Sequence, residues 1–239
     1  MTPSRRPASW WPDLLLVIGV AALTAALAAG WFLGVDVAVA HWCDAHRPER
    51  FNWLVYAGTT LGQGGPLSGA CAVLALWLGW RRHTVRPVLP VAAAFLLTTA
   101  ATYPVKTVAA RPAPHAQIPH PERFGLGGVS YPSGHLVVVV VWYGVLALLV
   151  SPWLPDGWRR VLRVAPVVLV TVTTIYHGYH WVSDDVAGLM LGLLLDRLLR
   201  RVDWDRVPLG RRLDAAGWAG PGLPAAVRSE PVSTTVPRA

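Results

Sequence analysis

The chain has 239 residues, of which 54% are hydrophobic and only 14% are charged. This composition is too apolar for an ordinary soluble domain, in which about 25% of the residues are charged. The formal net charge is +8, but the arginines lie in short clusters between apolar blocks, a pattern that indicates membrane topology and contact with anionic lipids, not nucleic-acid binding. Two cysteines without a CxxC or Cys/His pattern exclude cysteine chemistry as the function.

Six apolar blocks follow one another along the chain, each near the length of about 20 residues that crosses a bilayer. They cover residues 14–33, 61–80, 87–108, 133–153, 161–176 and 185–199. Residues 34–60 are mixed in character and predict a loop with a short interfacial helix. The sequence therefore predicts an all-α integral membrane protein, a bundle of six transmembrane helices.

The chain divides into three parts on this basis. Residues 1–13 are a cytoplasmic N-terminus, residues 14–200 form the six-helix membrane domain, and residues 201–239 form a cytoplasmic tail. The tail is rich in Arg, Pro and Ser without a periodic pattern, so we expect it to be disordered from about residue 215 onward.

The orientation of the bundle follows from its basic residues, because cytoplasmic loops of membrane proteins carry an excess of Lys and Arg. One side holds five of them: Arg47, Arg50, Lys106, Arg111 and Arg123. The other side holds Arg5, Arg6, Arg81, Arg82, Arg86, Arg159, Arg160, Arg163, Arg197, Arg200, Arg201, Arg206, Arg211 and Arg212. We therefore expect both termini in the cytoplasm, and the loops after the first, third and fifth blocks outside.

Three polar segments fall at block ends on the expected outer side. They are 106–112 (KTVAARP), 131–135 (YPSGH) and 176–184 (YHGYHWVSD). Ionisable residues at membrane depth are costly and usually functional. These segments are therefore the candidate site.

Their residue types suit phosphoryl transfer. Lys106 and Arg111 can neutralise a phosphate, and the Ser133-Gly134 pair opens a helix, where free N–H groups favour an anion. His135 can protonate a leaving oxygen. His180 can attack phosphorus, and Asp184, four residues later, can hold its ring.

The same residues resemble the type 2 phosphatidic acid phosphatase superfamily, the lipid phosphate phosphatases related to vanadium haloperoxidases. The family pattern has three parts: Lys-x6-Arg-Pro, Pro-Ser-Gly-His and Ser-Arg-x5-His-x3-Asp. Residues 132–135 match the second part, and His180-x3-Asp184 matches the core of the third. The resemblance covers residues 14 to 200. It implies that Lys106, Ser133 and Gly134 bind phosphate, that His135 is the acid, that His180 is the nucleophile, and that Asp184 is its partner.

Two family arginines are absent. Counting from Lys106, the first falls on Ala113, and the Ser-Arg pair of the third part falls on Thr173-Thr174. By proximity, Arg111 and, after it, Arg123 are the candidate substitutes.

Each candidate also has an ordinary structural reading. Lys106 could be a snorkelling anchor, Ser133 a helix cap, and the two histidines interfacial residues bonded to backbone. Asp185 suits the start of the sixth helix. His177 and His180 lack a third ligand at suitable spacing, so the sequence predicts no metal and no cofactor.

The sequence thus predicts a metal-independent membrane phosphatase that acts on a lipid phosphate or pyrophosphate through a phospho-histidine, at the extracytoplasmic face of a bacterial plasma membrane. Its expected partners are an amphiphilic phosphate substrate and membrane lipids, with no nucleic acid. Two alternatives remain: a non-catalytic member that binds lipid phosphate, and a transferase that uses the same site. The sequence does not distinguish the lipid or the oligomeric state.

Overall fold

The computed structural model describes residues 7–47 and 52–209, and these residues form helices and loops without a β-strand. The helices are α1 (Trp11–Ala28), α2 (Leu33–Ala45), α3 (Asn52–Thr60), α4 (Gly64–Arg82), α5 (Val88–Ala109), α6 (Gly134–Leu149), α7 (Asp156–Tyr176) and α8 (Val182–Arg201). The prediction of an all-helical fold is confirmed. Part of the expected tail, from residue 210 onward, lies outside the described residues.

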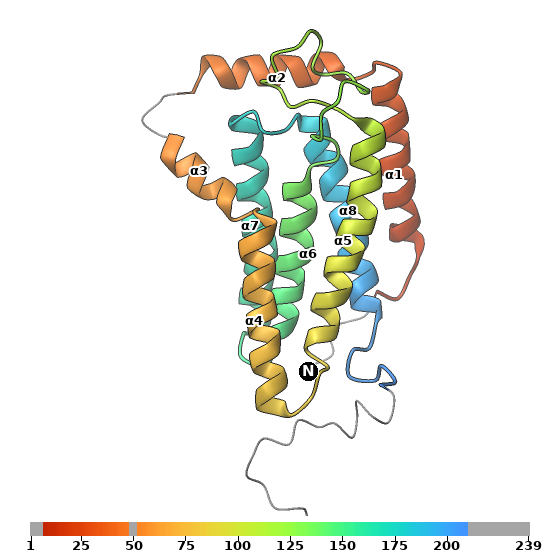
Figure 1. The fold of residues 1–239 in the computed structure, drawn as a ribbon, viewed down its shortest axis with the longest axis vertical. Helices are drawn as coiled ribbons and strands as arrows, with labels where there is room; N and C mark the ends of the chain where they lie inside the picture. Colours follow the sequence, from red (N-terminus) through yellow and green to blue (C-terminus); the bar gives the residue numbers. More distant parts are fainter. Residues whose placement is uncertain (1–6, 48–51, 210–239) are drawn as a thin grey trace, which may run out of the picture.

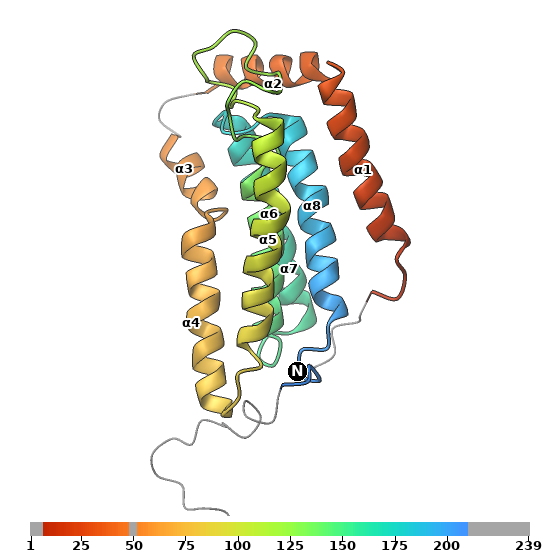
Figure 2. The same cartoon turned by 45° about the vertical axis from the view of Figure 1, so that its right-hand side comes forward.

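Helices α1 and α4 to α8 run along the long axis of the molecule, and α2 lies across one end (Figure 1). Helix α6 is the centre of the bundle, because most of its side chains are buried and it packs against α4, α5, α7 and α8. Helix α1 stands on the outside next to α8, as the turned view in Figure 2 makes clear.

The six predicted blocks correspond to α1 and to α4 through α8. The first block was expected to reach residue 33, but α1 ends at Ala28. Gly30 and Phe32 then adopt positive φ angles of 86° and 65°, and the chain turns into α2. Residues 34–60 contain most of two helices, α2 and α3, where one short helix was expected.

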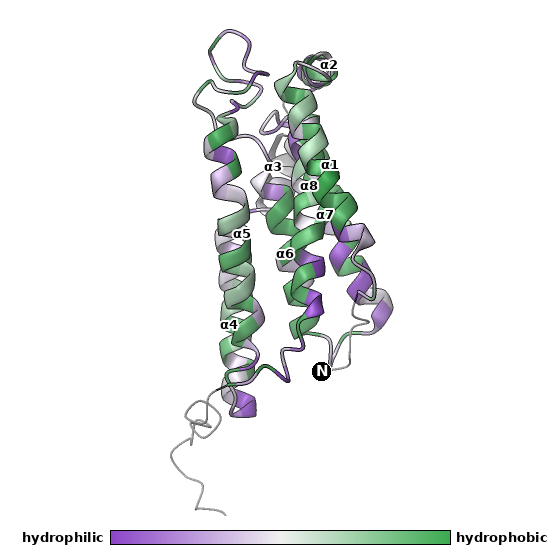
Figure 3. Cartoon of the chain, turned by 90° about the vertical axis from the view of Figure 1, so that its right-hand side faces the viewer, coloured by the Kyte–Doolittle hydropathy of each residue, from purple (hydrophilic) through white to green (hydrophobic). Residues whose placement is uncertain are grey.

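Among the described residues, two helices are long and apolar enough to cross a membrane by length and composition, namely Trp11–Ala28 and Val88–Ala109; the apolar helix Gly134–Leu149 is shorter. Hydrophobic residues cover much of the helices, while hydrophilic residues gather near helix ends and in the connections (Figure 3). Large apolar side chains in the middle of α5 and α7 lie on the surface, among them Phe95, Leu96 and Val168. The number of membrane crossings stays a prediction.

Close contacts and ion pairs fix α8 against its neighbours. A β-carbon on Gly188 would lie 2.5 Å from the carbonyl oxygen of Ser133, so only glycine lets α8 approach the start of α6 this closely. At the other end, buried Asp13 of α1 accepts hydrogen bonds from Arg197, at 2.9 Å, and Arg201 of α8. The packing brings the end of α5, the start of α6 and the α7–α8 connection to one end of the bundle, beneath α2.

Candidate active site

The three polar segments singled out in the sequence meet at this end. His135 follows the first residue of α6, His180 lies in the short connection between α7 and α8, and Lys106 is in the last turn of α5. The Nδ1 atom of His135 lies 3.1 Å from Nε2 of His180, and the two rings meet edge to face. The two imidazole rings, which come from separate helix ends, are therefore in direct contact.

The other nitrogen of His180 faces a hydroxyl and a carboxylate. Ser130 Oγ donates to Asp184 Oδ2 at 2.5 Å and lies 3.1 Å from His180 Nδ1. The carboxylate oxygen itself is 3.7 Å from Nδ1. Because the single proton of Ser130 goes to Asp184, its oxygen is free to accept one from Nδ1. This arrangement keeps the His180 proton on Nδ1 and leaves the Nε2 lone pair available.

Asp184 has no exposed surface, and its hydrogen-bonding capacity is filled. Oδ2 also accepts the backbone N–H of Trp181 at 3.1 Å, and Oδ1 accepts from Arg111 Nη1 at 2.6 Å. A buried carboxylate with these partners stays charged and can stabilise a positive charge on His180.

Arg111 is also fully buried, at 0% exposure. Besides Asp184 it donates to Ser183 Oγ at 2.7 Å, to the Glu122 carbonyl at 2.8 Å and to Asp36 Oδ2 of α2 at 2.7 Å. Its guanidinium also contacts the rings of Phe124 and Trp181. The donors of Arg111 are thus directed at protein groups, and its charge neutralises two buried carboxylates. This position differs from the phosphate-binding position that the sequence predicts for Arg111.

A cavity of about 770 Å³ opens beside the histidines. Its lining includes Lys106, Gly134, His135 and His180, together with Ser130 and Tyr179. Lys106 is the only lysine or arginine that lines it within the described part of the chain. Its ammonium group donates to the carbonyl of Val129, and it would lie 3.8 Å from a β-carbon on Gly134.

Ser133 behaves as a helix cap. Its Oγ accepts the N–H of Leu136 at 3.4 Å, its carbonyl accepts that of Val137, and the residue is fully buried outside the cavity wall. The first N–H groups of a helix have no partner within it. Those of Gly134 and His135 therefore remain available at the start of α6, where the sequence predicts that free N–H groups favour an anion.

The two positions where the family pattern has arginine are occupied differently. Ala113 lines the cavity with a methyl group. Thr174 is buried, and its hydroxyl donates to Asp185 Oδ2 at 2.7 Å. Arg123 is exposed and lies outside the cavity wall, so neither candidate substitute reaches the cavity in this structure.

Sequence reasoning missed three residues of this network: Asp36, Ser130 and Ser183. Asp36 is buried in α2, where it also accepts hydrogen bonds from the backbone N–H and the hydroxyl of Ser183. Its only signal in the sequence is a carboxylate in an apolar stretch. Ser130 has no signal beyond its place just before the 131–135 segment.

The segment before this motif is also fixed to α1. Thr24 Oγ1 donates to the Val20 carbonyl at 2.7 Å, so the Tyr131 hydroxyl donates to Thr24, at 2.6 Å. Burial raises the pKa of the Tyr131 phenol and keeps that proton in place.

No cluster of three His, Cys, Asp or Glu side chains suited to a metal occurs in residues 7–47 and 52–209.

The sequence of the chain is similar to those of known proteins. The family model described as "PAP2 superfamily" matches residues 87–208. The chain is 41% identical over 63 residues to an undecaprenyl-diphosphatase of Sulfolobus acidocaldarius, a match that covers 26% of this chain and 28% of that protein. It is 37% identical over 79 residues to phosphatidylglycerophosphatase B of Bacillus subtilis, with 31% and 39% covered. These matches therefore span less than half of either relative.

A solved structure is similar in fold. The crystal structure of a transmembrane PAP2 type phosphatidylglycerolphosphate phosphatase from Bacillus subtilis superposes with a TM-score of 0.70 at 22% identity. The alignment covers 82% of this chain and 98% of that one. The likeness therefore concerns the whole helical bundle.

The place of Arg111 predicts a structural role. Arg111→Ala leaves the buried carboxylates of Asp36 and Asp184 without their cation, and breaking a buried ion pair typically costs about 3–5 kcal/mol. We expect a large fall in the thermal unfolding temperature of the purified protein. Exposed Arg123→Ala, the matched control, should change stability by less than about 0.5 kcal/mol. An unchanged unfolding temperature together with a raised KM for a phosphate ester would instead make Arg111 a substrate ligand.

Proposed function

The chain belongs to the PAP2 superfamily, and from this premise we propose that it is a membrane phosphatase that removes phosphate from an amphiphilic phosphate ester or pyrophosphate through a phospho-histidine on His180. One observation carries the proposal. The Nδ1 side of His180 is held by Ser130 and Asp184, while its Nε2 lies at the cavity, 3.1 Å from His135. A nucleophile, its supporting carboxylate and an adjacent acid thus form one unit.

In the first step, the phosphate group enters between the two histidines and displaces their mutual contact. His180 Nε2 attacks phosphorus and forms a P–N bond, and the bond from phosphorus to the lipid oxygen breaks. His135, entering the step protonated, gives its proton to that oxygen. The positive charge that develops on His180 is stabilised through Nδ1 by Ser130 and buried Asp184.

In the second step, water attacks the phospho-histidine. His135, now neutral, takes a proton from the water as the new P–O bond forms. The P–N bond breaks, and its electron pair returns to His180 Nε2. Inorganic phosphate leaves, and both histidines regain their starting protonation states.

The negative charge of the phosphate is met by a small set of groups. Lys106 supplies the cation, and the N–H groups of Gly134 and His135 at the start of α6 supply directed donors. Because α6 begins at the cavity, the positive end of its dipole also favours an anion there. These groups need no metal ion to hold a phosphate, and we propose metal-independent hydrolysis.

The cavity suits an amphiphile. Apolar side chains lie beside its polar groups: Ile118, Leu126, Val129 and Val138. Ile118, Leu126 and Val129 are exposed, which would otherwise be unfavourable in an outer loop. Both matched relatives are named as phosphatases, one for undecaprenyl diphosphate and one for phosphatidylglycerophosphate, and this supports a lipid phosphate as the substrate class.

We place this end of six membrane-crossing helices on the extracytoplasmic side, with both termini in the cytoplasm, because the basic residues concentrate at the opposite end. Gln117→Cys should react with a membrane-impermeant thiol reagent added outside intact bacterial cells that produce the protein. Gly157→Cys, exposed at the other end of the bundle, should react only after the cells are opened. The native Cys43 and Cys71 are buried and give little background. The reverse labelling pattern would overturn this orientation.

The reaction itself is tested by phosphate release from phosphatidate, phosphatidylglycerol phosphate and a polyprenyl diphosphate. With purified protein, we expect release from at least one substrate in EDTA and inhibition by vanadate, which mimics five-coordinate phosphorus. His180→Ala should lower the rate by about 10³-fold or more. His41→Ala, an exposed histidine on α2, is the control and should leave it unchanged. Loss of activity in EDTA that Mg²⁺ or Zn²⁺ restores would contradict metal independence, and no release from any substrate would favour a binding protein.

The roles of the two histidines predict different defects. A lipid alkoxide is a poor leaving group and needs a proton, whereas p-nitrophenolate hardly does. His135→Ala should therefore slow phospho-enzyme formation from a lipid phosphate by about 10²–10⁴-fold, and from p-nitrophenyl phosphate much less. His180→Ala should form no phospho-enzyme from either. Single-turnover kinetics measures both, and equal impairment of His135→Ala on the two substrates would refute its role as the acid.

A further inference from the structure

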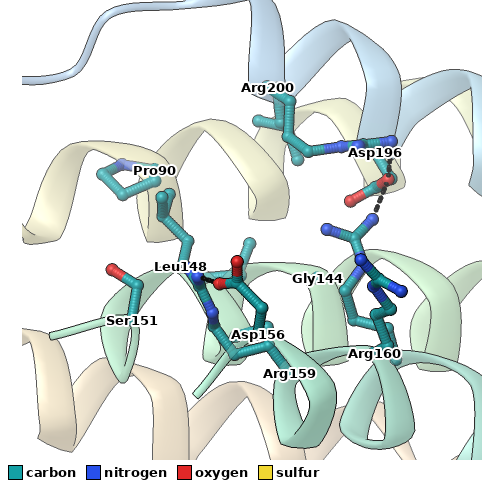
Figure 4. A pocket seen from close by; sticks show the side chains of 13 residues that line it. Pro90, Gly144, Leu148, Ser151, Asp156, Arg159, Arg160, Asp196 and Arg200 are labelled. Atoms are coloured by element: carbon teal, nitrogen blue, oxygen red, sulfur yellow. Dashed lines mark hydrogen bonds and ion pairs between the residues drawn. The ribbon is translucent and has the colours of Figure 1, made fainter. Parts of the chain in front are cut away.

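A second cavity lies at the opposite end of the bundle from the histidines. It has a volume of about 710 Å³ and is enclosed by α5, α6, α7 and α8. Asp196 and Arg200 of α8 face it from one side, and Asp156, Arg159 and Arg160 of α7 from the other (Figure 4). None of its lining residues belongs to the catalytic cavity.

The wall carries more positive than negative charge. Buried Asp196 accepts a hydrogen bond from Arg163 at 2.5 Å and forms an ion pair with Arg200 at 2.7 Å. Asp156 forms an ion pair with Arg159. Both carboxylates are thus already neutralised. Arg160 has no hydrogen bond or ion pair to any described residue. In total, four arginines and two aspartates line this cavity.

Three buried donors on the same wall also lack partners among the described residues. They are the Nε atoms of Arg159 and Arg200 and the hydroxyl of Ser151, a residue only 6% exposed. A buried polar group without a hydrogen bond typically costs about 1–3 kcal/mol. Donors of this kind beside Arg160 fit a ligand that offers several acceptor oxygens and a negative charge, as a phosphate group does.

The rest of the wall is apolar. Val145, Leu148 and Leu199 line the cavity beside the charged groups. The adjoining connection and first turn of α7 carry Trp153 and Trp158, which are 56% and 63% exposed. Exposed tryptophans are typical of the headgroup level of a membrane, so an arginine-rich cavity wall lies next to side chains that favour the lipid interface.

We propose that this cavity binds the phosphate group of an anionic amphiphile, as a second site separate from the catalytic one. Arg160 and Arg159 supply the charge from α7, Arg200 supplies a donor from α8, and Ser151 supplies its hydroxyl from the end of α6. The bound headgroup joins α6, α7 and α8 at the end where Arg163 and Asp196 already pair. A ligand held there stabilises the folded bundle by mass action.

The test is thermal unfolding of the full-length protein in a neutral detergent, with added phosphatidylglycerol, phosphatidylcholine or inorganic phosphate. Phosphatidylglycerol should raise the Tm of the wild type, and phosphatidylcholine should not. The Arg159→Gln/Arg160→Gln double variant should lose at least half of that shift. The Arg81→Gln/Arg82→Gln double variant, which also removes two positive charges at the same end but outside the cavity, should keep it.

Lys106→Gln removes the cation of the catalytic cavity and should also keep the shift, which distinguishes the two sites. A shift from inorganic phosphate would indicate that the phosphate group suffices, and a shift from phosphatidylglycerol alone would assign the site to a lipid headgroup; both support the proposal. Should the double variant fold poorly, Arg160→Gln alone carries the test, since this exposed side chain makes no hydrogen bond or ion pair with another described residue. The proposal is overturned if the double variant keeps the full shift, if Lys106→Gln abolishes it, or if the wild type shows none.

Discussion

The structure of the end of the bundle that carries His135 and His180 depends on one buried carboxylate, that of Asp184. Removing a charge from water costs several kcal/mol unless it is paired and hydrogen-bonded. Arg111, Ser130 and the N–H of Trp181 meet that need; the first two lie at the two ends of the α5–α6 loop, and Trp181 directly precedes α8. The loop between α5 and α6 therefore has to fold back over α8, and this carries Ser130 to His180 and His135 to the cavity.

In this structure, one cation neutralises the carboxylates of the protein and another lies in the wall of the cavity. Arg111 sits behind the histidines and neutralises protein carboxylates, whereas Lys106 lies in the cavity wall. With Ala113 in the wall and Thr174 bonded to Asp185, the cavity depends on Lys106 and on backbone donors for its positive potential. A single ammonium and a helix start favour a compact, highly charged group without fixing its orientation as an arginine fork does.

Much of this arrangement could be predicted from the sequence, because its determinants are local. Apolar block length marks six helices, and Pro-Ser-Gly-His and His180-x3-Asp184 lie at helix starts where spacing alone places their side chains. The role of Arg111 could not be predicted, because its neighbours Asp36 and Ser183 are 75 and 72 residues away in sequence. The interposed hydroxyl of Ser130 was missed for the same reason: it lies 54 residues from Asp184 and follows no periodic pattern. The turn at Gly30 and Phe32, which ends α1 early, depends on positive φ angles that hydropathy does not reveal.

The position of Asp36 on α2 bears on how separable the parts of this molecule are. The segment that matches the family model, residues 87–208, contains every proposed catalytic residue but neither Asp36 nor Asp13. An excised fragment of that length would hold Arg111 with one of its two carboxylates, and Arg197 and Arg201 without the aspartate they share. The residues proposed for catalysis therefore lie within a shorter stretch of the chain than the residues that pair the buried charges. The N-terminal helices complete the charge balance of the core, and a chimera that exchanged them would have to supply a carboxylate at the same place.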